Sequence, residues 1–142
     1  MRVVTGIVLT ALVVAGCSGP VRIDPPAPQG EAAAGCERLA RELPQELDGA
    51  KRRETTPRSP YVAVWGDGEI ALRCGVPRPT AMNPTDTVPE VNGVAWFADP
   101  ERPTLFTAVD REAYIEVTIS REHTPGNVLV DLAQPIKKAF PH

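Results

Sequence analysis

YVAVWGDGEIALRC, residues Tyr61–Cys74, decides the fold, because apolar side chains recur along it with a period of two. Two apolar runs flank Gly66-Asp67-Gly68, a short glycine-containing turn that is typical of a β-hairpin. The second run divides into two faces: Ile70, Leu72 and Cys74 on one, and Glu69, Ala71 and Arg73 on the other. The sequence therefore predicts a hairpin whose second strand directs Cys74 into the core.

An amphipathic helix is predicted ahead of this hairpin. Its apolar side chains recur at helical spacing from Gly35 onward: Cys36, Leu39, Ala40, Leu43 and Leu47. Because proline removes a hydrogen-bond donor and clashes with the preceding turn, Pro44 predicts that the helix ends or kinks near Leu43. A short further turn to Leu47 would then be closed by Asp48-Gly49.

Later segments complete the predicted fold. Asn92-Gly93 marks a hairpin within Val88–Ala98, and further strands are predicted over Thr104–Val109 and Ala113–Ser120. A C-terminal helix capped by Asn127, with a break at Pro135, presents Val128, Leu129, Leu132, Ile136 and Phe140. We therefore predict an α+β fold with an N-terminal helix, a largely antiparallel sheet of about five strands, and a C-terminal helix on the same face of that sheet.

The N-terminus resembles an export signal. Arg2 precedes a short apolar run that ends in Val14-Ala15-Gly16-Cys17, and this run is too short to span a bilayer, which needs about 20 apolar residues. The block resembles a bacterial lipobox, which implies that the Cys17 thiol receives a diacylglyceryl group carrying fatty acids such as palmitate, that the signal is cut before Cys17, and that Cys17 becomes the acylated N-terminus. The alternatives are ordinary signal cleavage near Ala15, which would leave a free thiol at Cys17, or an uncleaved anchor.

These features divide the chain into three parts. Residues 1–16 are expected to be a lipoprotein signal peptide, residues 17–34 the lipidated cysteine with a Pro/Ala-rich tether, and residues 35–142 one small α+β domain. An extended tether of this kind, at about 3.1 Å per residue, would hold the domain up to roughly 50 Å from the lipid.

If Cys17 carries lipid, Cys36 and Cys74 remain as one cysteine pair. They lie on the apolar faces of the predicted helix and strand, and export would place them where disulfides persist. Their spacing matches no CxxC redox or zinc pattern, and His123 and His142 add no second cluster, so we predict a structural disulfide and no metal site. Closing this loop would stabilise the fold by about 4 kcal/mol in the chain-entropy model.

The charge distribution excludes nucleic-acid binding. The chain has a formal net charge of −3, and loss of Arg2 with the signal makes it more negative. Lys51-Arg52-Arg53 with Arg58 is the one basic cluster, and Glu54 interrupts it. Contact with anionic lipid headgroups is one interpretation of this cluster, although a solvated loop is the more common meaning of such a run.

Several blocks together resemble a known family. They are Cys36 followed by Leu43-Pro44, then Trp65–Pro79, Val91–Phe97 and Tyr114–Val117. They are similar to small exported proteins of actinobacteria that share the domain of unknown function 3515. The resemblance implies an envelope location, often with a lipobox or anchor, and two framework cysteines matching Cys36 and Cys74. It implies no established activity, and Gly68 departs from the proline expected near that turn.

An enzyme is one functional hypothesis. Ser120, His123 and either Asp131 or Asp110 are the candidates for nucleophile, base and orienting acid in a small extracytoplasmic hydrolase. No serine lies in a G-x-S-x-G elbow, and His123 follows the pattern of an exposed turn residue. No phosphate loop or dinucleotide fingerprint occurs, so no cofactor is predicted.

A non-catalytic binding module is the hypothesis we prefer from the sequence. Trp65, Trp96 and Arg73, with Tyr61 and Phe97, would line a groove beside the loop from Val76 to Pro89. The simpler interpretation of both tryptophans is core packing. An accessory or structural protein of the envelope is a third interpretation, which differs mainly in what is bound.

The sequence thus predicts an uncharacterised lipoprotein at the outer, extracytoplasmic face of the cytoplasmic membrane. Its expected partners are the membrane, through the lipid anchor at Cys17, and an envelope protein or cell-wall ligand.

Overall fold

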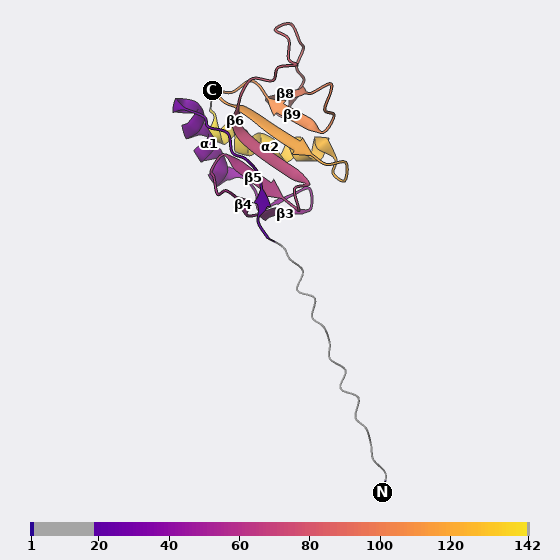
Figure 1. Ribbon diagram of the computed structural model, residues 1–142. Helices are drawn as coiled ribbons and strands as arrows, with labels where there is room; N and C mark the ends of the chain where they lie inside the picture. The colour runs from indigo at the N-terminus through magenta and orange to yellow at the C-terminus, as the bar shows by residue number, and fades with distance from the viewer. Residues whose placement is uncertain (2–18, 142) are drawn as a thin grey trace.

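An antiparallel sheet of eight strands forms the centre of the molecule, and two helices cover one of its faces (Figure 1). The computed structural model describes Met1 and residues 19–141, so Cys17 and most of the expected signal peptide lie outside the described part. The helices are α1 (Gly30–Glu42) and α2 (Pro125–Ala139). The sheet strands are β2 (Glu46–Leu47), β3 (Ala50–Arg53), β5 (Val62–Trp65), β6 (Ile70–Val76), β7 (Glu90–Val91), β8 (Val94–Ala98), β9 (Leu105–Ala108) and β10 (Tyr114–Ile119).

The strands run in the order β2-β3-β5-β6-β10-β9-β8-β7, and every neighbouring pair is antiparallel. β6 and β10 occupy the centre, where Cys74 lies opposite Ile115 and Arg73 lies opposite Glu116. Because side chains alternate between faces, this register separates an apolar face from a face with charged residues. The apolar face packs under the helices.

Both helices contribute to a single core on that face. α1 and α2 contact each other, α1 contacts β6, and α2 contacts β7 and β8. The largest fully buried side chains include Trp65, Trp96 and Phe140. The α+β class and the positions of the two helices are therefore as the sequence predicts.

A disulfide joins Cys36 on α1 to Cys74 on β6. Both cysteines are fully buried, at the point where the helix crosses the central strands. The predicted pairing is confirmed, and it ties the N-terminal helix covalently to the middle of the sheet.

The predicted strand number, about five, is too low. The difference arises mainly at Asp48-Gly49, which the sequence suggests as the end of a helical turn. Both residues have positive φ, 46° and 81°, and they form the two-residue turn of a hairpin between β2 and β3. Asp-Gly is a favoured pair for such turns because both central residues must adopt left-handed conformations. The polar run Lys51-Arg52-Arg53 is thus part of a strand and not a loop.

The break expected at Pro135 is also wrong. α2 begins at Pro125, with Thr124 as its N-cap, and continues through Pro135 to Ala139. Proline removes one backbone hydrogen bond, but the turn that follows it carries Ile136 and Ala139, which are both fully buried. Burial of this apolar face offsets the local cost and keeps the helix continuous.

The segment expected as a tether differs from the structure in its described part. β1 (Val21–Arg22) pairs in parallel with β4 (Thr55–Thr56), and α1 already begins at Gly30. Val21 N–H donates to the Glu54 carbonyl at 2.9 Å, and Ile23 N–H donates to the Thr56 carbonyl at 3.2 Å. From Gly19 onward the chain therefore lies against the domain. Within the described residues, no helix has the length and hydrophobicity to cross a membrane.

Gly35 on α1 lies directly against Phe140, the residue that follows α2. A Cβ added there would lie 2.0 Å from the buried Phe140 ring, whereas a Cβ added at Gly126 on α2 meets nothing within 4 Å. We predict that Gly35→Ala lowers the free energy of unfolding by about 1–3 kcal/mol, because this overlap outweighs the better helix propensity of alanine. Urea denaturation measures the change.

Gly126→Ala is the matched control, because it makes the same substitution within a helix in open space. We expect its stability to equal or slightly exceed that of the parent chain. If both variants unfold at the same urea concentration, the helices do not approach as closely at Gly35 as the structure has them.

Candidate anion-binding site

The structure does not bring together the binding surface predicted from the sequence. Trp65 and Trp96 are 0% and 2% exposed and lie on the helix-covered face of the sheet. Trp65 Nε1 donates to the Pro44 carbonyl at 3.0 Å. Arg73 points from the opposite face, because it neighbours Cys74 along the strand. Core packing therefore accounts for both indoles.

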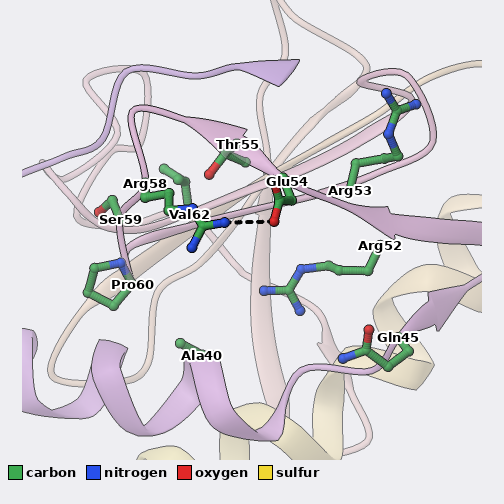
Figure 2. Close-up of a pocket in the computed structure, with 10 residues that line it drawn as sticks. All are labelled: Ala40, Gln45, Arg52, Arg53, Glu54, Thr55, Arg58, Ser59, Pro60 and Val62. Carbon is green, nitrogen blue, oxygen red and sulfur yellow. Dashed lines mark hydrogen bonds and ion pairs between the residues drawn. The ribbon is translucent and has the colours of Figure 1, made fainter. Parts of the chain in front are cut away.

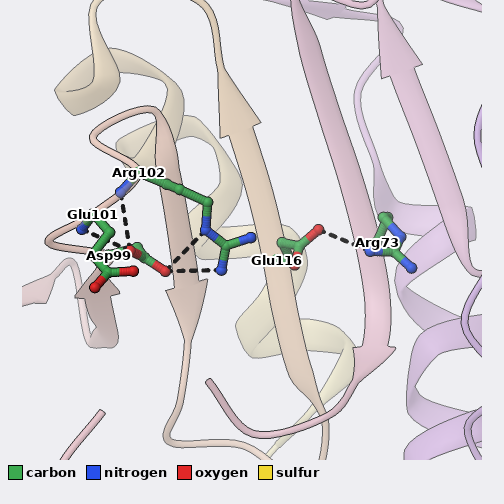
Figure 3. Close-up of polar contacts among 5 residues, drawn as sticks. All are labelled: Arg73, Asp99, Glu101, Arg102 and Glu116. Carbon is green, nitrogen blue, oxygen red and sulfur yellow. Dashed lines mark hydrogen bonds and ion pairs between the residues drawn. The ribbon is translucent and has the colours of Figure 1, made fainter. Parts of the chain in front are cut away.

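Arg73 belongs to a set of ion pairs on that opposite face (Figure 3). It donates to Glu116 at 3.1 Å, directly across the β6–β10 ladder, and to the Asp24 carbonyl at 3.2 Å. Beside this pair, Arg102 donates to Asp99 at 2.9 Å. Each arginine is matched by a carboxylate, so these residues mainly connect strands and the N-terminal segment.

Asp99 also fixes the turn that follows β8. Its carboxylate accepts hydrogen bonds from the N–H groups of Glu101 and Arg102, at 2.9 and 3.0 Å (Figure 3). Burial raises the pKa of Asp99, but the hydrogen bonds from the Arg102 side chain and from both N–H groups outweigh it and lower the pKa. This carboxylate is satisfied within the turn and has a structural role.

His123 lies between two carboxylates. Its Nδ1 is 3.2 Å from Asp48 and its Nε2 is 2.8 Å from Glu69. Asp48 also accepts from Thr124 N–H and from Asn127 Nδ2, each at 3.2 Å. His123 therefore links the β2–β3 turn, the β5–β6 hairpin and the start of α2.

The predicted hydrolase residues do not form a triad with His123. The carboxylates at its ring are Asp48 and Glu69, whereas Asp110 pairs with Arg111 and Asp131 is exposed. The buried Ser120 Oγ has no hydrogen-bond partner within the described part of the chain. With both ring nitrogens facing carboxylates, His123 has none directed at a serine.

The same geometry argues against a metal at His123. The two carboxylates contact opposite nitrogens of the ring, so the three groups do not converge on one point. Residues 19–141 contain no cluster of three or more His, Cys, Asp or Glu side chains placed to hold a metal ion.

A cavity of about 610 Å³ lies between α1 and the strands β3 and β4 (Figure 2). Its lining includes three arginines, Arg52, Arg53 and Arg58, and the uncharged polar residues Gln45, Thr55 and Ser59. Glu54 is the one carboxylate among the lining residues, and Arg58 donates to it at 2.7 Å. Cationic donors thus outnumber acceptors around this hollow.

Arg52 is the central side chain of the cavity. Its guanidinium lies over the Trp65 ring, 5.2 Å from the centroid, because the two residues are direct partners in the β3–β5 ladder. Burial lowers the pKa of Arg52. Within residues 19–141 no carboxylate or carbonyl accepts a hydrogen bond from its guanidinium. A half-buried cation without a counter-charge is costly, so this site favours an incoming anion.

The side chains of the three arginines point in different directions relative to the cavity. Arg52 and Arg58 extend into the hollow from opposite sides, whereas Arg53 is directed away from it (Figure 2). Arg53 pairs with Asp67 and donates to the Gly19 carbonyl at 2.6 Å. Guanidinium groups suit planar or tetrahedral oxyanions because they present parallel donors. The cavity is therefore a candidate site for a phosphate or carboxylate group.

The sequence pattern alone favours a solvated loop for this cluster. The signal that points to a site is the Asp48-Gly49 turn, because a hairpin there makes Lys51-Arg52-Arg53 a strand. Alternation along that strand then sends Arg52 and Arg53 to opposite faces.

The His123 cluster generates a pH-dependent prediction. The hydrogen bond to Glu69 raises the pKa of His123, burial opposes this, and Asp48 adds to the rise. The stabilisation is therefore fully present below the unfolded pKa of about 6.5 and is lost as pH rises through the higher folded value. We expect His123→Gln to destabilise the protein more at about pH 5.5 than at about pH 8.5.

Urea denaturation of both chains at the two pH values measures this difference. Asp48 and Glu69 are the carboxylates that face the ring. Hydrogen bonds from Asn127 and from Thr124 N–H lower the pKa of Asp48. Protonation of Asp48 at still lower pH therefore removes a separate contribution to stability. An equal stability gap at both pH values would contradict the prediction.

Comparison with known proteins places the chain in a family. No curated protein and no solved structure matches it. A family model matches residues 1–142, the full sequence, which confirms the family resemblance carried by blocks such as Trp65–Pro79. The chain therefore belongs to the family described as "Protein of unknown function (DUF3515)".

Proposed function

We propose that this protein is a lipid-anchored, non-catalytic binding module of the cell envelope, and that the Arg52 cavity takes an anionic group of its ligand. The anchor is a diacylglyceryl group on the thiol of Cys17, and the domain lies on the extracytoplasmic side of the membrane. Two acyl chains suffice for stable anchoring, so the domain needs no apolar membrane-binding face.

One observation carries the choice of site: Arg52 is half-buried over Trp65 and has no counter-charge among the described residues. The other arginines of the cavity are already paired, Arg58 with Glu54 and Arg53 with Asp67. Both of those pairs are largely exposed on the carboxylate side, and exposed pairs contribute little to stability. Arg58 can thus exchange Glu54 for a ligand oxygen at small cost.

The neutral groups of the cavity support the same proposal. Gln45 and Ser59 supply further donors beside the two guanidinium groups. The arrangement contains no nucleophile next to a free base, so it favours binding and not turnover.

The binding proposal is tested with inorganic phosphate as the probe. Titration followed by NMR is expected to shift the signals of Arg52 and its neighbours. Arg52→Gln should weaken the apparent affinity roughly 10-fold to 100-fold, because a charge-assisted hydrogen bond contributes about 1.5–3 kcal/mol. The phosphate affinity of Arg52→Lys should lie between those of the parent chain and Arg52→Gln, since lysine keeps the charge but lacks the parallel donors of a guanidinium.

Arg121→Gln is the matched control. It removes the same charge from an exposed residue that makes no ion pair within the described chain and does not line the cavity. If both variants weaken phosphate binding equally, the change comes from the net charge of the protein and not from a specific site at Arg52. Binding that is unaffected by Arg52→Gln would overturn the site.

The anchor is tested by metabolic labelling with a clickable fatty acid in cells that export the protein. The parent chain is expected to be labelled and Cys17→Ala to be unlabelled. Equal labelling of both would show that Cys17 is not the acylated residue.

A further inference from the structure

We propose that the anion taken by the Arg52 cavity is the phosphate of an anionic phospholipid headgroup, so that the domain lies directly on the bilayer through the β3–β4 end. This inference rests on the proposed acylation of Cys17. It replaces a domain on a long tether by a domain whose own cavity faces the surface to which it is anchored.

The continuous described chain begins at Gly19, beside the strand that carries Arg52 and Arg53. The Gly19 carbonyl accepts a hydrogen bond from Arg53, whose side chain points away from the cavity but whose chain neighbours Arg52 and Glu54 line it. Cys17 and Ser18 come directly before Gly19, and two residues of chain span at most about 7 Å. An acyl group on Cys17 would therefore bring Arg53 close to the lipid headgroups, whatever conformation those two residues adopt.

The first described segment, from Gly19 to Asp24, is fixed to the cavity wall. Val21 N–H donates to the Glu54 carbonyl, and β1 continues in register with Thr55 and Thr56 of β4. Arg73 holds the next part of the segment by donating to the Asp24 carbonyl. The chain leaves the fold beside β3 and β4, at one end of the molecule (Figure 1).

Several cationic side chains lie close together at this end of the molecule. Lys51 is exposed on the same strand as Arg52 and Arg53, and Arg58 follows on the adjoining loop. At physiological salt, surface potentials act over about 8–10 Å. This range is comparable to the maximum distance of about 7 Å between Cys17 and Gly19. The overall charge of the chain is −3, and this local basic cluster supplies charge that complements an anionic leaflet.

The anchor also removes the need for high affinity. A group tethered beside its ligand experiences an effective concentration in the millimolar range or above. Under those conditions, the half-buried Arg52 together with Arg58, which can exchange Glu54 for a ligand oxygen, is sufficient for binding. The long loop between β6 and β7 projects from the opposite end and would face away from the membrane (Figure 1).

The experiment uses the acylated protein in nanodiscs that carry a spin label on a lipid headgroup. Intact mass first shows whether the chain carries acyl groups. In discs of phosphatidylcholine with phosphatidylglycerol, we expect the amide signals of Arg53 and Glu54 to broaden strongly, and those of Thr85 and Asp86 in the β6–β7 loop to change little. Replacing phosphatidylglycerol by phosphatidylcholine should reduce the contrast several-fold.

Arg52→Gln is expected to remove most of this dependence on anionic lipid, and Arg121→Gln to retain it. A mass without acyl groups would overturn the anchor, and with it the proposed function. An acylated protein whose β3–β4 signals are not selectively broadened would overturn the orientation alone. Inorganic phosphate binding at Arg52 without any response to phosphatidylglycerol would identify a free anion as the ligand and overturn the headgroup assignment.

Discussion

The covalent link between Cys36 and Cys74 holds α1 on the central strand, and the position of the cavity depends on it. α1 contributes one wall of the cavity through Ala40, and the opposite wall comes from β3, β4 and the loop that leads into β5. Trp65 is fully buried, and its ring packs against the Arg52 guanidinium. If the helix were free to move from the sheet, the wall and the stacking surface would separate. The crosslink therefore preserves a charged hollow beside an otherwise apolar core.

Simple periodicity predicts the centre of the fold well. β6 and β10 alternate strictly, so the spacing of apolar residues is enough to place Leu72, Cys74 and Val117 in the core. The cysteine pairing follows because both thiols lie on apolar faces. The periphery is harder to predict, since β2 and β3 are short and polar and depend on the left-handed turn at Asp48-Gly49. Local signals there fit a helix end as well as a hairpin, and only pairing with β5 decides between them.

The residues of the candidate site are even harder to predict from the sequence than the peripheral strands. Aromatic character favours Trp65 and Trp96 as binding residues, but large indoles in strands are usually buried, and both are. Arg52 cannot be singled out from the sequence, because its meaning depends on what lies opposite it in the ladder and on which carboxylates it fails to meet. Whether a charged side chain has a partner depends on the folded structure, and no sequence pattern records it. The sequence does indicate His123 as a candidate base, whereas its two carboxylates, Asp48 and Glu69, come from distant turns.

The sheet ends on both sides in a strand of only two residues, β2 and β7. Such short margins offer few unpaired backbone groups to a neighbouring copy of the chain. Proteins anchored to a membrane, as proposed for this chain, meet one another more often than proteins in bulk solution. Short sheet margins would then limit the pairing of neighbouring copies edge to edge.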